Sequence, residues 1–308
     1  MMSFHAYCAQ IEKRFEDALS KCMDAFSTGS EFHEPDFTAG IVLNLPRILN
    51  RSGVLPGFRF GGCFIHQSPY ITYQYYGKSK CELGDLLILC RDSSLGRERF
   101  NAVLLQLKMA DRKHIDQAQW RVYARWPPFD FGNVLTDRPH YDIYPKTITQ
   151  GALYAFVHPK DNASNCNLRF TVAAPSKKVY VNNVDIRDGE SLARFLSGFV
   201  TWTNGRTISD ERHQRDDSWS HLIWELVTFL NGKTFRRRNI RMHNGNTVDG
   251  RFERRNGTFF DALLDEPPIE EWEGFLPRQD DVLQGSVYKR GFGMLLIDKK
   301  SVPTQCEF

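Results

Sequence analysis

The chain has 308 residues, of which 41% are apolar and 25% are charged, and its formal net charge at pH 7 is +3. This is the composition of an ordinary soluble protein whose core suffices for one large or two medium domains. No run of 18 apolar residues and no signal-peptide core is present, so the sequence excludes a membrane-spanning helix and predicts no membrane partner.

Apolar residues at helical spacing predict an amphipathic helix over residues 3–26. A second helix is expected to open at Glu34 and to be interrupted by Pro46. The apolar runs 84–90 and 101–108 are separated by turn-forming residues and predict a β-hairpin. The next predicted element is a helix that carries Gln119 and Tyr123.

Further along, apolar runs predict strands at 152–157, 168–173 and 179–181, followed by a helix over 191–202. Residues 203–215 are polar and are typical of a linker or loop, after which Asp216 or Asp217 can cap another helix. Strands backed by helices predict an α/β fold with a mixed central sheet. We expect residues 1–205 to form the main domain and residues 206–308 to form an α+β C-terminal extension, for which packing on the core is one arrangement.

The predicted hairpin brings polar residues together. If its turn is centred near Leu95 and Gly96, Asp85 lies opposite Gln106, with Cβ atoms about 4.5 to 5.5 Å apart. Gln106 and Lys108 then project from the same face, whereas Leu105 and Leu107 point to the other. A carboxylate and an ammonium on apolar strands cost free energy unless they are paired or bind a ligand. Mg²⁺ or Mn²⁺ would supply that ligand, because such cations prefer oxygen donors.

This pattern resembles the PD-(D/E)XK nuclease superfamily, in which an Asp on one strand and an acid or Gln followed by x-Lys on the next hold the metal. The Gln106-Leu107-Lys108 version is similar to Mrr-type restriction enzymes, and Gln119 to Tyr123 is similar to the Q-x-x-x-Y element of RecB-type nucleases. The resemblance implies a restriction-endonuclease-like sheet flanked by helices. It further implies Asp85, Gln106 and Glu34 as metal ligands, Lys108 as the residue beside the attacking water, and Gln119 and Tyr123 as supporting groups.

Two features of this assignment keep alternatives open. Gln106 replaces the commoner acid, so the site has one negative charge fewer unless Glu34 or Glu82 compensates. Glu34 is equally well explained as an acid in the first turn of a helix, where it interacts favourably with the helix dipole. Without a metal role, Asp85 is explained as a strand-end residue, Lys108 as an edge lysine, and Gln119 and Tyr123 as the semi-polar face of a surface helix.

Charge is unevenly distributed in the C-terminal region. Residues 233–255 contain eight basic and two acidic residues, and residues 256–281 contain eight acidic residues and one basic residue. The basic stretch could follow a phosphate backbone, and its candidate nucleic-acid-binding residues are Arg236, Arg237, Arg238 and Arg241. It could equally be a solvated face or the partner of the acidic stretch behind it.

The sequence therefore predicts a metal-dependent endonuclease that acts on nucleic acid, DNA more than RNA, in restriction or anti-phage defence. A catalytically inactive nucleic-acid- or protein-binding module on a degenerate nuclease scaffold is the main alternative, and a metal-independent enzyme built on Cys or His is another. A regulatory protein partner and a homo-oligomer stay open. The seven cysteines are odd in number and include no Cys-x-x-Cys pair, which favours a cytoplasmic protein over a disulfide scaffold or a zinc ribbon.

Overall fold

The structure is a computed structural model of the whole chain. It describes residues 3–24, 34–52, 55–65, 68–74, 77–110, 116–131, 140–146, 150–158, 169–175, 189–210, 217–234, 240–241, 247–248, 259–264 and 291–300. The strand expected at 179–181 lies outside these residues. None of the described helices is long and apolar enough to cross a membrane.

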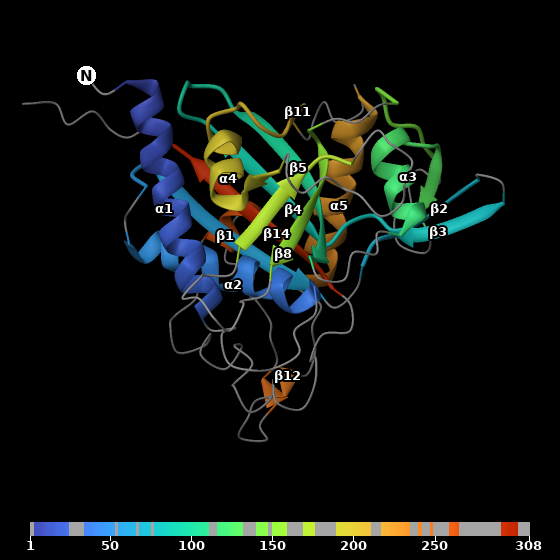
Figure 1. Cartoon of the computed structure of the whole chain (residues 1–308), viewed down its shortest axis with the longest axis horizontal. Coiled ribbons are helices and arrows are strands. Elements are labelled where there is room, and N and C mark those ends of the chain that lie inside the picture. Colours follow the sequence, from blue (N-terminus) through green and yellow to red (C-terminus); the bar gives the residue numbers. More distant parts are fainter. Residues whose placement is uncertain are drawn as a thin grey trace, which may run out of the picture.

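A mixed eight-stranded sheet forms the centre of the molecule (Figure 1). Along its main path the strands are β1 (Phe58–Ile65), β14 (Phe292–Lys299), β4 (Leu86–Asp92), β5 (Arg99–Met109), β8 (Ala152–His158), β9 (Arg169–Ala173) and β10 (Glu190–Ser191). The β14–β4 and β5–β8 pairs are parallel, whereas the other pairs on this path are antiparallel. The eighth strand, β11 (Arg206–Ile208), pairs with the first part of β5. The predicted α/β class with a mixed central sheet is confirmed.

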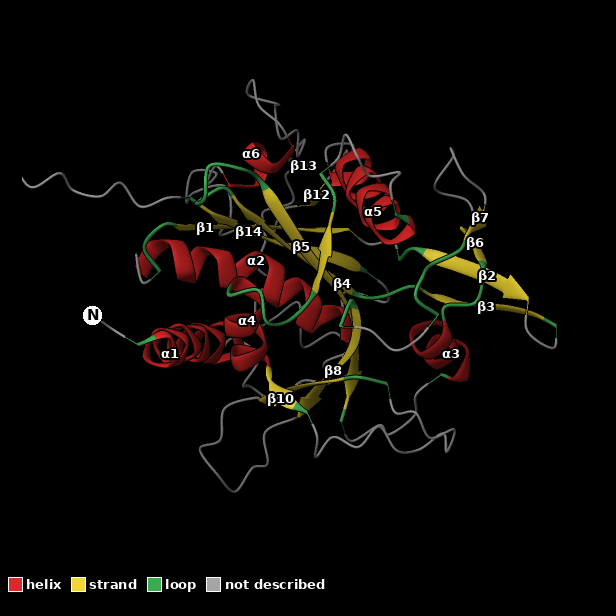
Figure 2. Ribbon diagram, turned by 90° about the horizontal axis from the view of Figure 1, so that it is seen from above, coloured by secondary structure: helices red, strands yellow, loops and turns green. Residues whose placement is uncertain are grey.

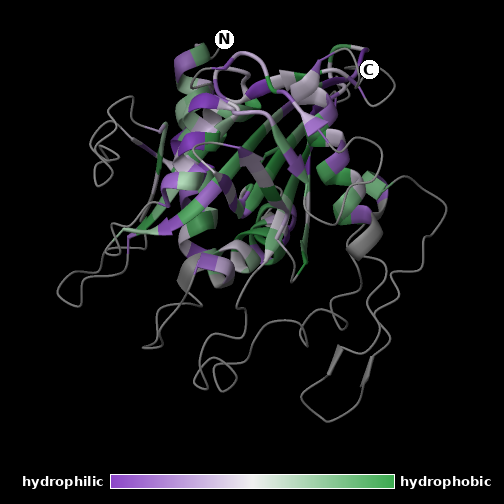
Figure 3. Ribbon diagram, turned by 90° about the vertical axis from the view of Figure 1, so that its right-hand side faces the viewer, coloured by the Kyte–Doolittle hydropathy of each residue, from purple (hydrophilic) through white to green (hydrophobic). Residues whose placement is uncertain are grey.

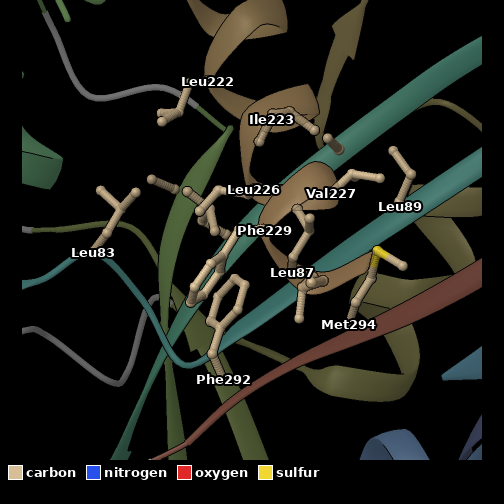
Figure 4. Packing of buried hydrophobic residues seen from close by; sticks show 14 of the residues in the cluster. Leu83, Leu87, Leu89, Leu222, Ile223, Leu226, Val227, Phe229, Phe292 and Met294 are labelled. Atoms are coloured by element: carbon tan, nitrogen blue, oxygen red, sulfur yellow. The ribbon is translucent and has the colours of Figure 1, made fainter. Parts of the chain in front are cut away.

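Helices cover both faces of this sheet (Figure 2). One face packs against α1 (Phe4–Asp24), α2 (Glu34–Ser52) and α4 (Leu192–Val200), and the other packs against α5 (Ser218–Thr234) and α6 (Phe259–Leu264). Side chains along β4 alternate between the two cores, and the strand is therefore an unbroken apolar run in the sequence. In the core beneath α5, side chains of β4 and β14 pack against side chains of α5 (Figure 4).

Hydrophobic residues accordingly line the central strands, and hydrophilic ones gather on outer surfaces of the helices (Figure 3). The long amphipathic helix expected at the N-terminus is α1, whose residues Ile11, Phe15 and Leu19 are buried. Burial of these apolar side chains by the hydrophobic effect accounts for the arrangement of helices on both faces of the sheet.

Pro46 does not end α2, which continues to Ser52. The expectation of an interrupted helix was wrong. Proline removes the N–H that would bond to the Val42 carbonyl one turn earlier. That carbonyl lies against β1, so closely that a Cβ atom on Gly62 would be 1.9 Å from its oxygen. The helix therefore tolerates Pro46 where the freed carbonyl faces a glycine of the neighbouring strand.

A smaller sheet lies at one side of the molecule and has the order β3-β2-β6-β7. Its strands are β3 (Lys78–Glu82), β2 (Tyr70–Gln74), β6 (Phe129–Phe131) and β7 (His140–Tyr141). Helix α3 (Gln117–Arg125) packs against it and is capped by Asp116, whose side chain accepts a 2.8 Å hydrogen bond from the Ala118 N–H. This helix forms part of the crossover between the parallel strands β5 and β8.

The expected boundary at residue 205 falls between α4 and β11, and residues on both sides of it contribute to the central sheet. Within the stretch expected to be a linker, three residues form β11, so that part of the expectation was wrong. Helix α5 begins as predicted, and the Asp217 carboxylate accepts a 2.9 Å hydrogen bond from the Ser220 N–H. Strand β14 lies between β1 and β4, and the short strands β12 (Ile240–Arg241) and β13 (Thr247–Val248) pair with each other.

Candidate active site

The β4–β5 hairpin places Asp85 opposite Gln106, as its predicted register requires. Leu86 pairs with Leu105, and Asp85 comes immediately before that pair. The Asp85 N–H donates to the Leu105 carbonyl at 2.9 Å, and the Asp85 carbonyl accepts from the Gly293 N–H of β14 at 2.9 Å. The backbone of Asp85 is therefore held by a strand on each side.

The side chains of Asp85, Gln106 and Gln119 form one buried hydrogen-bonded chain. Gln106 donates from Nε2 to Oδ2 of Asp85, and the same oxygen accepts a 2.7 Å bond from the Leu107 N–H. Gln119, on α3, donates from Nε2 to Oε1 of Gln106 at 3.0 Å. The three residues are 4%, 1% and 5% exposed. The fold thus brings two residues of the hairpin and one of the following helix into direct contact.

Tyr123 of α3 supports the segment that leads into Asp85. Its hydroxyl donates a 2.7 Å hydrogen bond to the Leu83 carbonyl. A Cβ atom on Gly84 would lie 3.0 Å from the same hydroxyl, so glycine is the residue that lets the tyrosine approach. Gln119 and Tyr123 are four residues apart on one face of the helix, and both point toward the hairpin.

Burial raises the pKa of the Asp85 carboxyl from 3.8 to about 8, since an apolar environment disfavours the charged form. The positive charge of Lys108 and the Leu107 N–H oppose this shift, whereas the negative charges of Glu82 and Glu34 add to it. Lys108, Glu82 and Glu34 are therefore near enough to act on Asp85 electrostatically. Near neutral pH this carboxyl holds a proton unless a positive charge takes its place.

The two glutamates approach Asp85 from different layers. Glu34 is the first residue of α2, which covers the face of the sheet opposite to α3. It accepts a long 3.4 Å hydrogen bond from the Met109 N–H at the end of β5. Glu82 ends β3, where the Tyr70 hydroxyl donates to its Oε1 at 2.9 Å. Glu82 contributes more than Glu34 to the raised pKa of Asp85. Its place three residues before Asp85 was the only signal in the sequence that pointed to it.

Metal-binding chemistry can be tested against this arrangement. Asp85, Gln106 and the glutamates carry oxygen donors of the kind that Mg²⁺ prefers, and Asp85 is a buried acid whose ionised form is only partly compensated by the charge of Lys108. Within the described part of the chain, no three His, Cys, Asp or Glu side chains are grouped to hold a metal ion. The Gln106 oxygen faces Gln119 rather than Asp85. The donor chemistry therefore fits a hard divalent cation, provided that the Gln106 amide can turn.

The residues expected to bind nucleic acid are not placed by the structure. Arg236, Arg237 and Arg238 lie outside the described residues, and Arg241 lies in β12 with its side chain undescribed. Sequence reasoning did not consider the two arginines of α3, Arg121 and Arg125, in a helix that contains no acidic residue. The Arg125 guanidinium lies over the Trp120 ring, 6.0 Å from its centroid. The helix that supplies Gln119 and Tyr123 therefore also presents positive charge.

Comparison with models of protein families, with curated proteins and with solved structures found no match.

Proposed function

We propose that this protein is a Mg²⁺- or Mn²⁺-dependent nuclease of the PD-(D/E)XK type that hydrolyses phosphodiester bonds in nucleic acid, DNA in preference to RNA. One observation carries the proposal: Asp85 and Gln106 are in contact at the end of the hairpin, and α3 adds Gln119 and Tyr123 to the same cluster. A buried carboxyl with a raised pKa beside a lysine is typical of functional sites. A restriction-endonuclease-like core built on β4, β5, α3 and β8 is part of the proposal.

Each residue of the cluster has a definable task. A bound divalent cation would supply an activated water and positive charge at the scissile phosphate. Asp85 and Gln106 would hold the cation through oxygen atoms, and Glu34 or Glu82 would supply a further carboxylate donor. The Lys108 ammonium would orient the attacking water and stabilise the negative charge that develops on the phosphate oxygens. Tyr123 keeps the Leu83–Asp85 segment in place through the Leu83 carbonyl.

The biological setting that we propose is cytoplasmic restriction or anti-phage defence. A nuclease with such a role needs control, either by reading a base sequence or by a partner protein that licenses cleavage. Phosphate contacts position a protein on nucleic acid without reading its sequence. A regulatory partner is therefore included in the proposal.

The direct test is cleavage of supercoiled plasmid, single-stranded DNA and RNA in Mg²⁺, Mn²⁺ or EDTA. We expect the wild type to cut only with metal and Lys108→Ala to lose at least about a hundredfold in rate, the usual loss when a charge-stabilising group is removed. Lys78→Ala is the matched control, because Lys78 is an exposed lysine on β3. Equal cleavage by wild type and Lys108→Ala would refute the role of Lys108, and cleavage in EDTA would refute the metal dependence.

One observation favours a second candidate function, a nucleic-acid- or protein-binding module without catalysis. Gln106 provides no negative charge, and its amide N–H₂ rather than its oxygen faces Asp85. Metal titration separates the two functions, since a ligand that binds only the folded state raises the melting temperature. Stabilisation by Mn²⁺ that Asp85→Asn removes supports the nuclease, whereas an unchanged melting temperature supports the binding module.

The surface of α3 that carries Arg121 and Arg125 predicts a salt-dependent contact with the phosphate backbone. We expect Arg125→Gln to weaken DNA binding and to lower the slope of log affinity against log salt by about one, the loss of one phosphate contact. Binding is measured in EDTA by fluorescence anisotropy, so that cleavage does not interfere. Arg194→Gln is the control, because Arg194 is an exposed arginine on α4, over the opposite face of the sheet. An unchanged slope in Arg125→Gln would exclude this surface from the interface.

A further inference from the structure

Gln119 has one bonded end and one free end. Its Nε2 donates to Gln106, whereas its Oε1 is buried and has no hydrogen-bond partner among the residues that the structure describes. Buried polar atoms are rarely left unsatisfied, and each such atom calls for an explanation. Within the described part of the chain, rotation of the Gln119 amide by half a turn therefore breaks only its hydrogen bond with Gln106.

Gln106 differs from Gln119, because its amide is hydrogen-bonded at both ends. Both of its ends are bonded, with Nε2 on Asp85 and Oε1 on Gln119. In this orientation its N–H₂ group occupies the side on which an oxygen is needed for a cation beside Asp85. Turning Gln106 alone would bring its N–H₂ group against the N–H₂ group of Gln119, and two donors cannot bond to each other.

We propose that Gln119 is a positioning residue that lets the Gln106 amide turn its oxygen toward a divalent cation. The two amides rotate together, so that Gln106 donates from Nε2 to Oε1 of Gln119 and its own oxygen faces Asp85. The number of hydrogen bonds between the amides is unchanged. The bond from Gln106 to Asp85 is exchanged for oxygen donors from both residues, directed at the cation. This inference rests on the proposed metal-dependent function and deepens it.

The amide at position 106 explains why a rotation is needed. An acid at position 106 would present oxygen in either orientation and would need no rotation, whereas an amide has one oxygen and one nitrogen end. Residues that orient a metal ligand typically change metal affinity by about 10- to 100-fold when they are replaced. Gln119 would therefore matter more in a site with Gln106 than in the same site with a carboxylate at 106.

The test is a double-mutant cycle on Mn²⁺ affinity, measured by calorimetry and by electron paramagnetic resonance of free Mn²⁺. Gln119→Met, which has similar volume and cannot accept the bond, is expected to bind Mn²⁺ about 10- to 100-fold more weakly than the wild type. In the Gln106→Glu protein the same substitution is expected to change affinity less than about threefold. Wild-type affinity in Gln119→Met, or the same loss in both backgrounds, would overturn the inference.

Gln119→Glu provides a second test, which does not depend on whether Gln119→Met folds. A carboxylate at 119 accepts the bond from the rotated Gln106, so Mn²⁺ affinity is expected to equal or exceed that of the wild type, and weaker binding would overturn the inference. Failure of the proposed function is distinguishable, because wild-type protein would then bind no Mn²⁺ and cleave no nucleic acid. Mn²⁺-dependent cleavage by the wild type with unchanged affinity in Gln119→Met would overturn the amide rotation alone.

Discussion

Asp85→Asn is expected to abolish metal-dependent cleavage and at the same time to stabilise the metal-free protein at alkaline pH. Asparagine has nearly the same shape, and its carbonyl oxygen can still accept from Gln106 and from the Leu107 N–H. It carries no charge to hold a cation, so we expect a loss of about a thousandfold or more in rate, within the range seen when a charged catalytic group is removed.

The direction of the stability change follows from the pKa of Asp85. The carboxyl ionises near 3.8 in an ordinary environment and near 8 in the folded protein. Between these values Asp85 holds a proton in the folded protein that it lacks in the unfolded chain, so its contribution to the free energy of unfolding falls as pH rises from about 4 to about 8. A difference of one in pKa between the two states corresponds to about 1.4 kcal/mol. The amide introduced by Asp85→Asn does not titrate, and we expect the variant to exceed the wild type by about 2 kcal/mol or more at pH 9.

Urea unfolding in EDTA at pH 5 and pH 9 measures this difference, and plasmid cleavage in Mn²⁺ measures the rate. A residue that serves only the fold would lose stability on substitution at both pH values. Reduced stability of Asp85→Asn at pH 9 would therefore refute the electrostatic account, and wild-type cleavage would refute the catalytic one.

The local parts of the candidate site follow from the sequence because short-range rules determine them. A turn near Gly96, which has a φ of +79°, and alternation along two apolar runs suffice to set Asp85 against Gln106. The spacing of four between Gln119 and Tyr123 suffices to place both on one face of α3. In each case the residues that meet are joined by a short stretch of chain.

Contacts between elements that are far apart in the sequence were not predictable, because an apolar strand can pair with any other strand. Strand β14 is inserted between β1 and β4, and Gly293 bonds to Asp85 from the far end of the chain. Strand β11 has three residues, of which Arg206 and Thr207 are polar, so it shows no strand signal. The helix that continues through Pro46 packs its Val42 carbonyl closely against Gly62 of another element. Tertiary contacts override local propensity in all three.

Strand β14 also carries the largest expected effect on stability. Asp298, near its end, is fully buried, and its Oδ1 accepts from the Arg91 Nε of β4 at 2.8 Å. Arg91 is mostly buried, and its other acidic neighbours, Asp261 and Glu98, are 3.8 and 4.0 Å away. Asp298→Ala leaves this guanidinium without its close partner, so we expect a loss of about 3 to 5 kcal/mol in the free energy of unfolding.

Unfolding in urea at pH 7 tests this prediction. Replacing both residues with leucine removes the charges together, so Asp298→Leu with Arg91→Leu should regain most of the stability that Asp298→Ala loses. Glu98→Ala is the control and is expected to change stability by less than about 0.5 kcal/mol, because its side chain is 54% exposed. A loss below about 1 kcal/mol in Asp298→Ala would show that the pair does not hold β14 in the sheet.

The Arg91–Asp298 pair is connected to the candidate active site through strand β14. Gly293, which holds the Asp85 carbonyl, lies five residues before Asp298, or about 17 Å along an extended strand. Asp298→Ala is therefore expected to lower cleavage only by lowering the folded fraction, with an unchanged rate per folded molecule well below the melting temperature. Asp85→Asn shows the reverse pattern, in which the fold persists and the rate is lost. The two substitutions thus distinguish a loss of cleavage caused by removing the proposed metal ligand from a loss caused by unfolding of the sheet that holds it.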